Sequence, residues 1–192
     1  MTSDLYSFVF RGDLSTQAIE ATGLSASPVI MKEGLEEFGA ALSLDLLDEA
    51  DINVAQTMAL VYVAITAFER AARAFVKRVL IDSYADDWWS QGVSAKIQKF
   101  AQTRREDESK AKWHGERGDE LLDYTEMGHL PDIIQQNWSL FEAHIPRIDW
   151  ATAIFSSIER SRNVIMHSGE LSIEDAERVG MNIRDWSRQV GS

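Results

Sequence analysis

A long segment of helical periodicity beginning near Asp51 limits what this chain can fold into. Apolar side chains recur three and four residues apart from Asp51 to Val79, which places them on one face of an α-helix. A helix of roughly 30 residues exceeds the usual globular length, so it is either the spine of a helical bundle or a bent pair of helices. The residues expected to face inward are Ile52, Ala55, Met58, Ala59, Tyr62, Ile65, Phe68, Ala72, Phe75 and Val79.

The rest of the chain also has a helical pattern. Only three prolines occur in 192 residues, and helical spacing recurs along most of the sequence, which predicts an all-α protein built as an up-and-down helical bundle. The further predicted helices cover 28–42 (Ile30, Leu35, Phe38 and Leu42 inward), 86–101, a short pair around Pro131 in 121–141, 150–167, and 173–190. We expect residues 1–50 to form an N-terminal extension, with a short strand or coil at 4–10 and one helix, and residues 51–192 to form the helical domain.

Composition excludes several classes of protein. The 19 basic and 31 acidic residues leave a net charge of −12, which disfavours nonspecific binding of long nucleic acids but leaves room for one local basic site. The chain has no cysteine, and its histidines are not spaced as metal ligands, so we expect no metal and no cofactor. The longest apolar run, 58–68, is interrupted only by Thr66 and is shorter than the roughly 18 residues of a membrane span. Because residues 1–10 do not resemble a signal peptide either, we expect a cytoplasmic protein without a membrane partner.

The residues with the clearest chemical potential lie near the end of the helix predicted at 150–167. Arg162 falls on the same stripe as Ile158 and Ile165, so it points towards a packing surface. A guanidinium cannot lose its charge, and it must therefore meet a carboxylate, backbone carbonyls or an anionic ligand there. Asn163 and His167 are four residues apart on the adjoining face, where the amide could fix the tautomer of the imidazole for proton transfer.

A purely structural interpretation of the same residues is also open. A histidine in the last turn of a helix often only caps carbonyl groups and benefits from the helix dipole. The inward arginine could simply pair with Glu69 or another core acid. One arginine and one histidine are also an incomplete catalyst for RNA cleavage by the 2′-hydroxyl, which needs a base, an acid and a cation.

The residues Arg162 and Asn163, followed after three residues by His167, resemble the R-x4-6-H motif of the HEPN superfamily. The motif lies in the last third of the chain and precedes one terminal helix, as in HEPN domains. Glu69 and Arg73 are similar to the E-x3-[KR] element of the same superfamily.

A second segment supports this resemblance. Residues 122–141 are similar to the HEPN branch attached to the PIN-domain nuclease of yeast mRNA surveillance. The resemblance as a whole covers about 51–190. The residues that carry it in this second segment are Tyr124, Leu130, Ile133, Ile134, Asn137, Trp138 and Phe141.

The resemblance implies a homodimer with both Arg-His motifs in a cleft at the interface. The implied activity is metal-independent endoribonuclease cleavage, of the toxin or anti-phage defence type. In that scheme Arg162 holds the scissile phosphate and the two copies of His167 share acid and base catalysis. Asn163 orients His167 or contacts phosphate, while Glu69, with Arg73 as its partner, positions Arg162.

Two other implications of the resemblance concern partners. Some toxins of the superfamily are silenced by modification of a tyrosine two residues after the motif histidine, but that position is Gly169 here, so this route of control is not expected. An antitoxin or another regulatory protein is a candidate partner. The alternative function is a non-catalytic HEPN module that binds RNA or protein and dimerises.

A basic stretch could guide RNA to such a cleft. Residues 94–117 hold seven basic and four acidic residues. The alternative is an ordinary solvated surface, because acidic residues stand among the basic ones. The candidate RNA-binding residues are Lys96, Lys99, Arg104 and Arg105.

Overall fold

The computed structural model of the chain describes residues 38–111, 113 and 115–191. The chain divides into two units, 1–52 and 53–192. In the first unit, residues 38–41 are helical and η1 (Leu44–Leu46) is a 3-10 helix. The predicted strand at 4–10 and most of the predicted helix at 28–42 lie outside the described residues.

Two residues in the first unit correct the prediction from periodicity. Phe38 and Leu42 are 69% and 66% exposed, although the pattern predicts that they face inward. Periodicity identifies the residues that share a face of a helix, but it does not say what covers that face.

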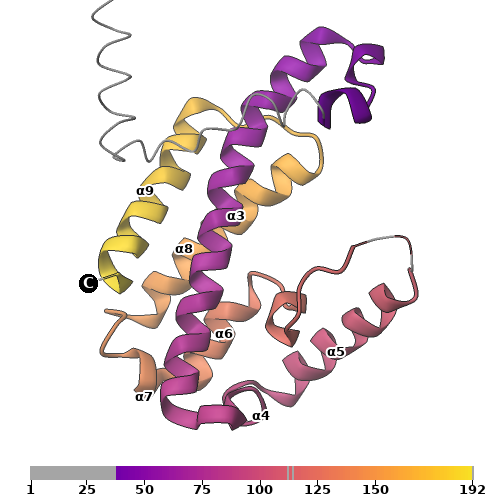
Figure 1. The fold of residues 1–192 in the computed structure, drawn as a ribbon. Coiled ribbons are helices and arrows are strands. Elements are labelled where there is room, and N and C mark those ends of the chain that lie inside the picture. Colours follow the sequence, from indigo (N-terminus) through magenta and orange to yellow (C-terminus); the bar gives the residue numbers. More distant parts are fainter. Residues whose placement is uncertain (1–37, 112, 114, 192) are drawn as a thin grey trace, which may run out of the picture. The chain divides into compact units, whose positions relative to one another are not determined.

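The second unit consists of helices, and the described residues contain no strand. The all-α prediction is therefore confirmed. Figure 1 shows α3 running through this unit, with α9 on one side of it, α5 on the other, and α8 crossing behind it. In chain order, the elements are α3 (Glu49–Tyr84), which begins just before the boundary, η2 (Ala85–Asp87), α4 (Trp88–Gly92), α5 (Ala95–Ser109), η3 (Leu121–Tyr124), α6 (His129–Gln136), α7 (Trp138–Phe141), α8 (Ile148–Met166) and α9 (Ile173–Val190).

The long helix α3 is continuous over 36 residues, so it is a spine rather than a bent pair. Its inward face is buried from Ile65 onwards, as the spacing predicts. In the first turns the prediction is confirmed for Met58, which is buried, but it is wrong for Ala55, Ala59 and Tyr62, which are exposed. The apolar stripe of α3 therefore begins closer to the N-terminus than the part of α3 that other helices cover.

Aromatic rings hold the centre of the core together. The buried Trp186 of α9 lies 5.0 Å from Phe155 of α8 and 5.9 Å from Phe68 of α3, measured between ring centroids. It also meets Phe75 edge-on at 5.7 Å. Edge-to-face contacts of this kind add to the stabilisation from apolar burial, so Trp186 joins three helices in one cluster.

The region between α3 and α8 differs from the prediction in detail. The single helix expected over 86–101 is two helices, because Val93 between α4 and α5 adopts an extended conformation. The helix α5 then continues through the charged run and ends at Ser109. The side chains of this charged run are mostly solvated. Pro131 lies within the first turn of α6, where a missing backbone N–H costs no hydrogen bond.

Buried Asn137 joins three of these segments. Its Nδ2 donates to the carbonyl groups of Gly92 and Ile133 at 2.7 and 2.8 Å. Its Oδ1 accepts a hydrogen bond from the Tyr84 hydroxyl at 3.1 Å. The side chain thereby ties the end of α3 to α4 and to the junction of α6 with α7.

One stretch of the described residues meets the length and composition criteria for a membrane span. It lies within Glu49–Gly92, where an 18-residue window has a mean hydropathy of 1.3 and 17% of that window is buried. Core helices of soluble proteins pass the same test, so this is weak evidence. The apolar run 58–68 by itself predicts no membrane span. The 18-residue window is longer than this run and also includes polar residues.

Candidate active site

The end of α8 fixes the position of His167. The Gly169 N–H donates to the Val164 carbonyl at 2.9 Å and the Ser168 N–H to the Ile165 carbonyl at 3.0 Å, which together form a Schellman motif. The left-handed residue of this motif is Ser168, with φ of 59°. Gly169 is needed for a different reason, since a Cβ there would lie 2.7 Å from the Val164 side chain and 2.9 Å from its carbonyl oxygen. His167 is the C-cap, and its side chain is exposed.

The three motif residues project from the last turns of α8. Arg162 is partly buried next to the buried Ile158, which agrees with its predicted place at the edge of the apolar stripe. Asn163 and His167 are exposed. The His167 backbone N–H donates to the Asn163 carbonyl at 3.2 Å. Within the described part of the chain, no hydrogen bond joins the Asn163 amide to the His167 imidazole, and the Arg162 side chain makes neither a hydrogen bond nor an ion pair.

Glu69 does not pair with Arg162. Its carboxylate lies 2.7 Å from Nη1 of Arg73, one turn along α3, and both side chains are about 15% exposed (14% and 16%). Arg73 also donates from Nε to the Leu122 carbonyl at 3.2 Å and from Nη2 to the Thr125 carbonyl at 2.8 Å. The pair therefore fastens the η3 segment to α3, and we call these four residues, Glu69, Arg73, Leu122 and Thr125, the clamp.

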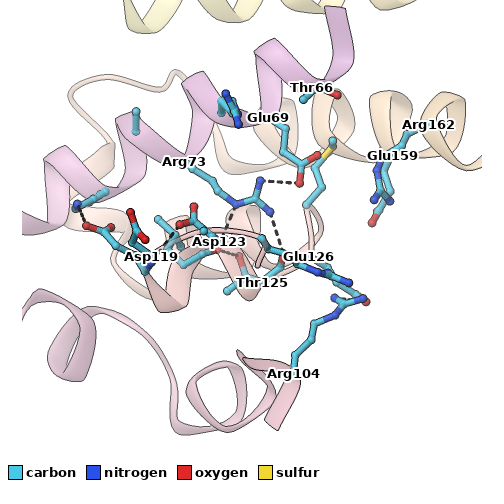
Figure 2. Close-up of a pocket in the computed structure, with 18 of the residues that line it drawn as sticks. Thr66, Glu69, Arg73, Arg104, Asp119, Asp123, Thr125, Glu126, Glu159 and Arg162 are labelled. Carbon is cyan, nitrogen blue, oxygen red and sulfur yellow. Dashed lines mark hydrogen bonds and ion pairs between the residues drawn. The ribbon is translucent and has the colours of Figure 1, made fainter. Parts of the chain in front are cut away.

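A large polar cavity lies beside Arg162. Its volume is about 1090 Å³, and its walls come from α3, α5, the segment around η3, and α8. Figure 2 shows Arg162 and Glu159 on one side of the view and Asp119 on the other, with Glu69, Arg73 and Thr125 of the clamp between them. Six basic and six acidic side chains line it, namely Arg70, Arg73, Lys77, Arg104, Arg117 and Arg162, and Glu69, Asp119, Glu120, Asp123, Glu126 and Glu159.

Most of the basic residues in the cavity wall already have acidic partners. Besides Arg73, these are Lys77 with Glu120, Arg104 with Glu126, and Arg117 with Glu108. Arg70 and Arg162 have no such partner among the described residues. Arg70 and Arg162 are therefore the basic side chains of the wall that are open to an anion, although the carboxylates of Asp119 and Glu159, which also lack an ion pair among the described residues, line the same cavity.

A second, shallower hollow lies on the outer face of α8. Its volume is about 550 Å³. All of its described lining comes from this one helix, so a single chain supplies only one side of it. Glu159 and Asn163 line both the cavity and the hollow, which are therefore adjacent. The lining residues are Ser156, Glu159, Arg160, Asn163, Val164 and the C-cap residue His167.

One of the four candidate RNA-binding residues reaches the cavity. Arg104 lines it, with its guanidinium 3.4 Å from Glu126 and 5.3 Å from the centre of the Phe100 ring. Lys96, Lys99 and Arg105 are exposed on α5 and do not line it. The sequence interpretation therefore found the right helix, but only one of its residues faces Arg162.

The sequence interpretation missed several residues that lie beside the motif. Glu159 could have been found from spacing alone, because it is three residues before Arg162 and four before Asn163 on the same helix. Arg70 and Asp119 gave no signal, since only the fold brings them to the cavity. Among the described residues, no group of three or more metal-ligating side chains lies together.

Comparisons with known proteins agree with the all-α fold. No curated protein and no solved structure matches the chain significantly. The profile of one family, described as Swt1-like HEPN, matches residues 64–191. This range includes Glu69, Arg73 and the residues from Arg162 to His167, and it extends over most of the chain. The protein therefore belongs to the Swt1-like HEPN family, and the predicted membership of the HEPN superfamily is confirmed.

Proposed function

We propose that this protein is a metal-independent endoribonuclease of the toxin or anti-phage defence type, which cleaves RNA by attack of the 2′-hydroxyl at a site formed by Arg162, Asn163 and His167. The observation that carries this proposal is Arg162, which lines a polar cavity five residues before His167 and whose partly buried guanidinium has no partner among the described residues. HEPN domains suggest a ribonuclease or RNA-binding function in general.

Each residue has a role that its chemistry supports. The planar guanidinium of Arg162 can bind two oxygens of the scissile phosphate and stabilise the charge that develops on phosphorus. The imidazole of His167 can transfer a proton, and its exposed position leaves it accessible to RNA. The amide of Asn163, between the two in the sequence, can bind phosphate or orient the imidazole.

We also propose that the site is completed in a homodimer. The hollow that holds His167 has described walls from α8 alone, and a second chain could supply the other side. Exposed apolar side chains near this end of the molecule are available for such an interface. Tyr62 and Met166 line the cavity and are 37% and 54% exposed, while Leu60 on the neighbouring turn of α3 is 61% exposed.

The proposed RNA contacts follow the cavity. Arg104 is the strongest of the four candidates on α5, because its ion pair with Glu126 is long and half-exposed and is therefore weak enough to exchange for a phosphate. We place Lys96, Lys99 and Arg105 in a weaker outer role. The proposal also includes a cytoplasmic location, an antitoxin or other regulatory protein as partner, and no membrane partner. Within the superfamily, we propose that the chain is nearest to the branch attached to the PIN-domain nuclease.

A second function, a non-catalytic module that binds RNA or protein, has one observation in its favour. The cavity wall carries equal numbers of basic and acidic residues, and most of its charges are already paired. A wall of this kind binds polyanions less strongly than a basic groove does.

The decisive experiment is cleavage of a mixed RNA substrate in the presence of EDTA. We would compare the native protein with His167→Ala and with the matched control His144→Ala, a second exposed histidine outside both hollows. Loss of EDTA-resistant cleavage only in His167→Ala supports the ribonuclease. Absence of cleavage by the native protein, or full cleavage by His167→Ala, contradicts it, and retained RNA binding would then favour the non-catalytic module.

A further inference from the structure

Glu159 is a carboxylate near the motif to which the proposed function assigns no role. It is partly buried and makes no hydrogen bond or ion pair with the described residues. Most other acidic residues of the cavity are engaged, since Glu69, Glu120 and Glu126 form ion pairs. Asp119 also lacks an ion pair, but it lies at the end of the cavity away from Arg162 (Figure 2).

The place of Glu159 in the site is distinctive. It is one helical turn before Arg162 and Asn163, and it lines both the cavity that holds Arg162 and the hollow that holds His167. A substrate phosphate bound by Arg162 would therefore have Glu159 on one side along the helix and His167 on the other. At a rise of 1.5 Å per residue, the eight-residue step from Glu159 to His167 spans about 12 Å of helix axis.

Gly128 leaves room for this carboxylate. A Cβ at Gly128 would lie 3.3 Å from Oε2 of Glu159, which is slightly tighter than most Cβ contacts, and 3.5 Å from Oε1, which is ordinary van der Waals contact. Gly128 itself has helical backbone angles, φ −64° and ψ −17°, so its conformation does not require glycine. The space beside Glu159, rather than backbone freedom, is what the missing side chain provides.

We propose that Glu159 is the general base for RNA cleavage at this site, an inference that rests on the proposed function. The Glu159 carboxylate accepts the proton of the ribose 2′-hydroxyl while the 2′-oxygen forms a bond to phosphorus. The bond from phosphorus to the 5′-oxygen breaks, and the imidazolium of His167 donates its proton to that oxygen. The products are a 2′,3′-cyclic phosphate and a 5′-hydroxyl end, and proton exchange with water restores both side chains.

This assignment resolves the shortage of catalytic groups within one chain. In-line attack requires the base and the acid to approach phosphorus from opposite sides, and the order Glu159, Arg162, His167 along α8 provides base, cation and acid in that sequence. The second chain of a dimer then supplies the missing wall of the hollow rather than the base. The partner's His167 is not needed for proton abstraction in this scheme.

The first test compares Glu159→Gln with Glu177→Gln, a matched change of an exposed glutamate on α9 outside both hollows. Removing a general base lowers the rate by about 10²- to 10⁴-fold, so we expect kcat for Glu159→Gln to fall at least 100-fold with KM changed less than about threefold. The acidic limb of the pH dependence of kcat/KM should disappear in the residual activity. Unchanged circular dichroism and thermal unfolding would establish that the isosteric variant is folded.

A second test separates the base from the acid. A uridine 3′-phosphate ester with a 4-nitrophenol leaving group needs no general acid, so His167→Ala should regain most of its activity on it while Glu159→Gln should not. Gly128→Ala, which crowds the carboxylate, should lower kcat several-fold on both substrates.

The outcomes also distinguish this inference from the proposed function. Native cleavage of RNA together with near-normal cleavage by Glu159→Gln would overturn the role of Glu159 and leave the ribonuclease intact. A large kcat loss that retains the acidic limb of the pH profile would show a positioning residue instead of a base, and would also overturn the inference. Native protein that does not cleave RNA would overturn both.

Discussion

At the scale of single residues, Arg162 is the side chain on which the proposed chemistry depends most. Its guanidinium is partly buried and lacks a protein partner, so a ligand determines what it binds. A lysine keeps the charge but cannot offer two parallel N–H donors to a phosphate. We therefore expect Arg162→Lys to lower kcat/KM almost as far as Arg162→Ala, by about 100-fold or more. Near-normal activity of the lysine variant in a steady-state cleavage assay would mean that positive charge alone suffices.

Substitutions at the two residues after His167 should have opposite effects on the free energy of unfolding. Ser168 holds a left-handed conformation that costs a non-glycine residue about 1 kcal/mol, so Ser168→Gly should stabilise the protein by roughly 0.5–1 kcal/mol. Gly169→Ala should destabilise it, since the new Cβ would lie 2.9 Å from the Val164 carbonyl oxygen. Urea unfolding of both variants would check this, and a stability gain in Gly169→Ala would contradict the geometry.

At the scale of secondary-structure elements, the clamp is the feature that holds one wall of the cavity. Arg73→Ala would leave the Glu69 carboxylate and the Thr125 carbonyl without their donor, and it would remove one of the three donors to the Leu122 carbonyl, which keeps the backbone N–H and the hydroxyl of Thr125. Because these groups are largely shielded from water, we expect a loss of about 2–4 kcal/mol in the free energy of unfolding. Arg78→Ala, on the exposed face of the same helix, is the control. Equal stability of the two variants would show that the clamp does not fasten η3.

The end of η3 is held by a tyrosine whose ionisation predicts a pH effect. The Tyr124 hydroxyl donates to the Gly118 carbonyl at 3.2 Å, and burial, with a smaller contribution from nearby Glu116, raises the pKa of Tyr124 above its ordinary value. Its stabilising contribution is complete below the unfolded pKa of about 10 and is lost as the pH rises through the folded value. The stability advantage of native protein over Tyr124→Phe should therefore shrink above pH 10. The free energies of unfolding of both proteins would be measured from pH 8 to 11. A difference between them that stays constant over this range would contradict this account.

At the scale of the whole molecule, the proposal requires two chains to meet at α8. We expect native protein to be a homodimer at micromolar concentration by light scattering, with α8 in the interface. Met166→Asp should weaken the dimer, because it places a charge beside the cavity, whereas Ile81→Asp near the other end of α3 should not. A monomeric native protein would contradict the composite site, whatever its activity.

Residue spacing and capping residues predicted the helices well where contacts between neighbouring residues fix the ends of a helix. The helix expected at 173–190 has those bounds as α9, since Ser172 and Asp175 form a capping box at its start. Two regions were predicted less well. The chain is extended at Val93, which divides a predicted helix, and the first turns of α3 expose a face that the pattern predicts to be buried.

By itself, the sequence determined that this chain is helical, where its last two helices lie, and that Arg162, Asn163 and His167 fall together at the end of one of them. These features depend on spacing of three and four residues, which a helix converts directly into proximity. Only the tertiary structure decided that Glu69 binds Arg73 instead of Arg162, that Arg104 alone of the basic residues on α5 predicted to bind RNA reaches the cavity, and that Gly128 leaves space for Glu159. Those choices join residues far apart in the chain, and they depend on which helices pack together.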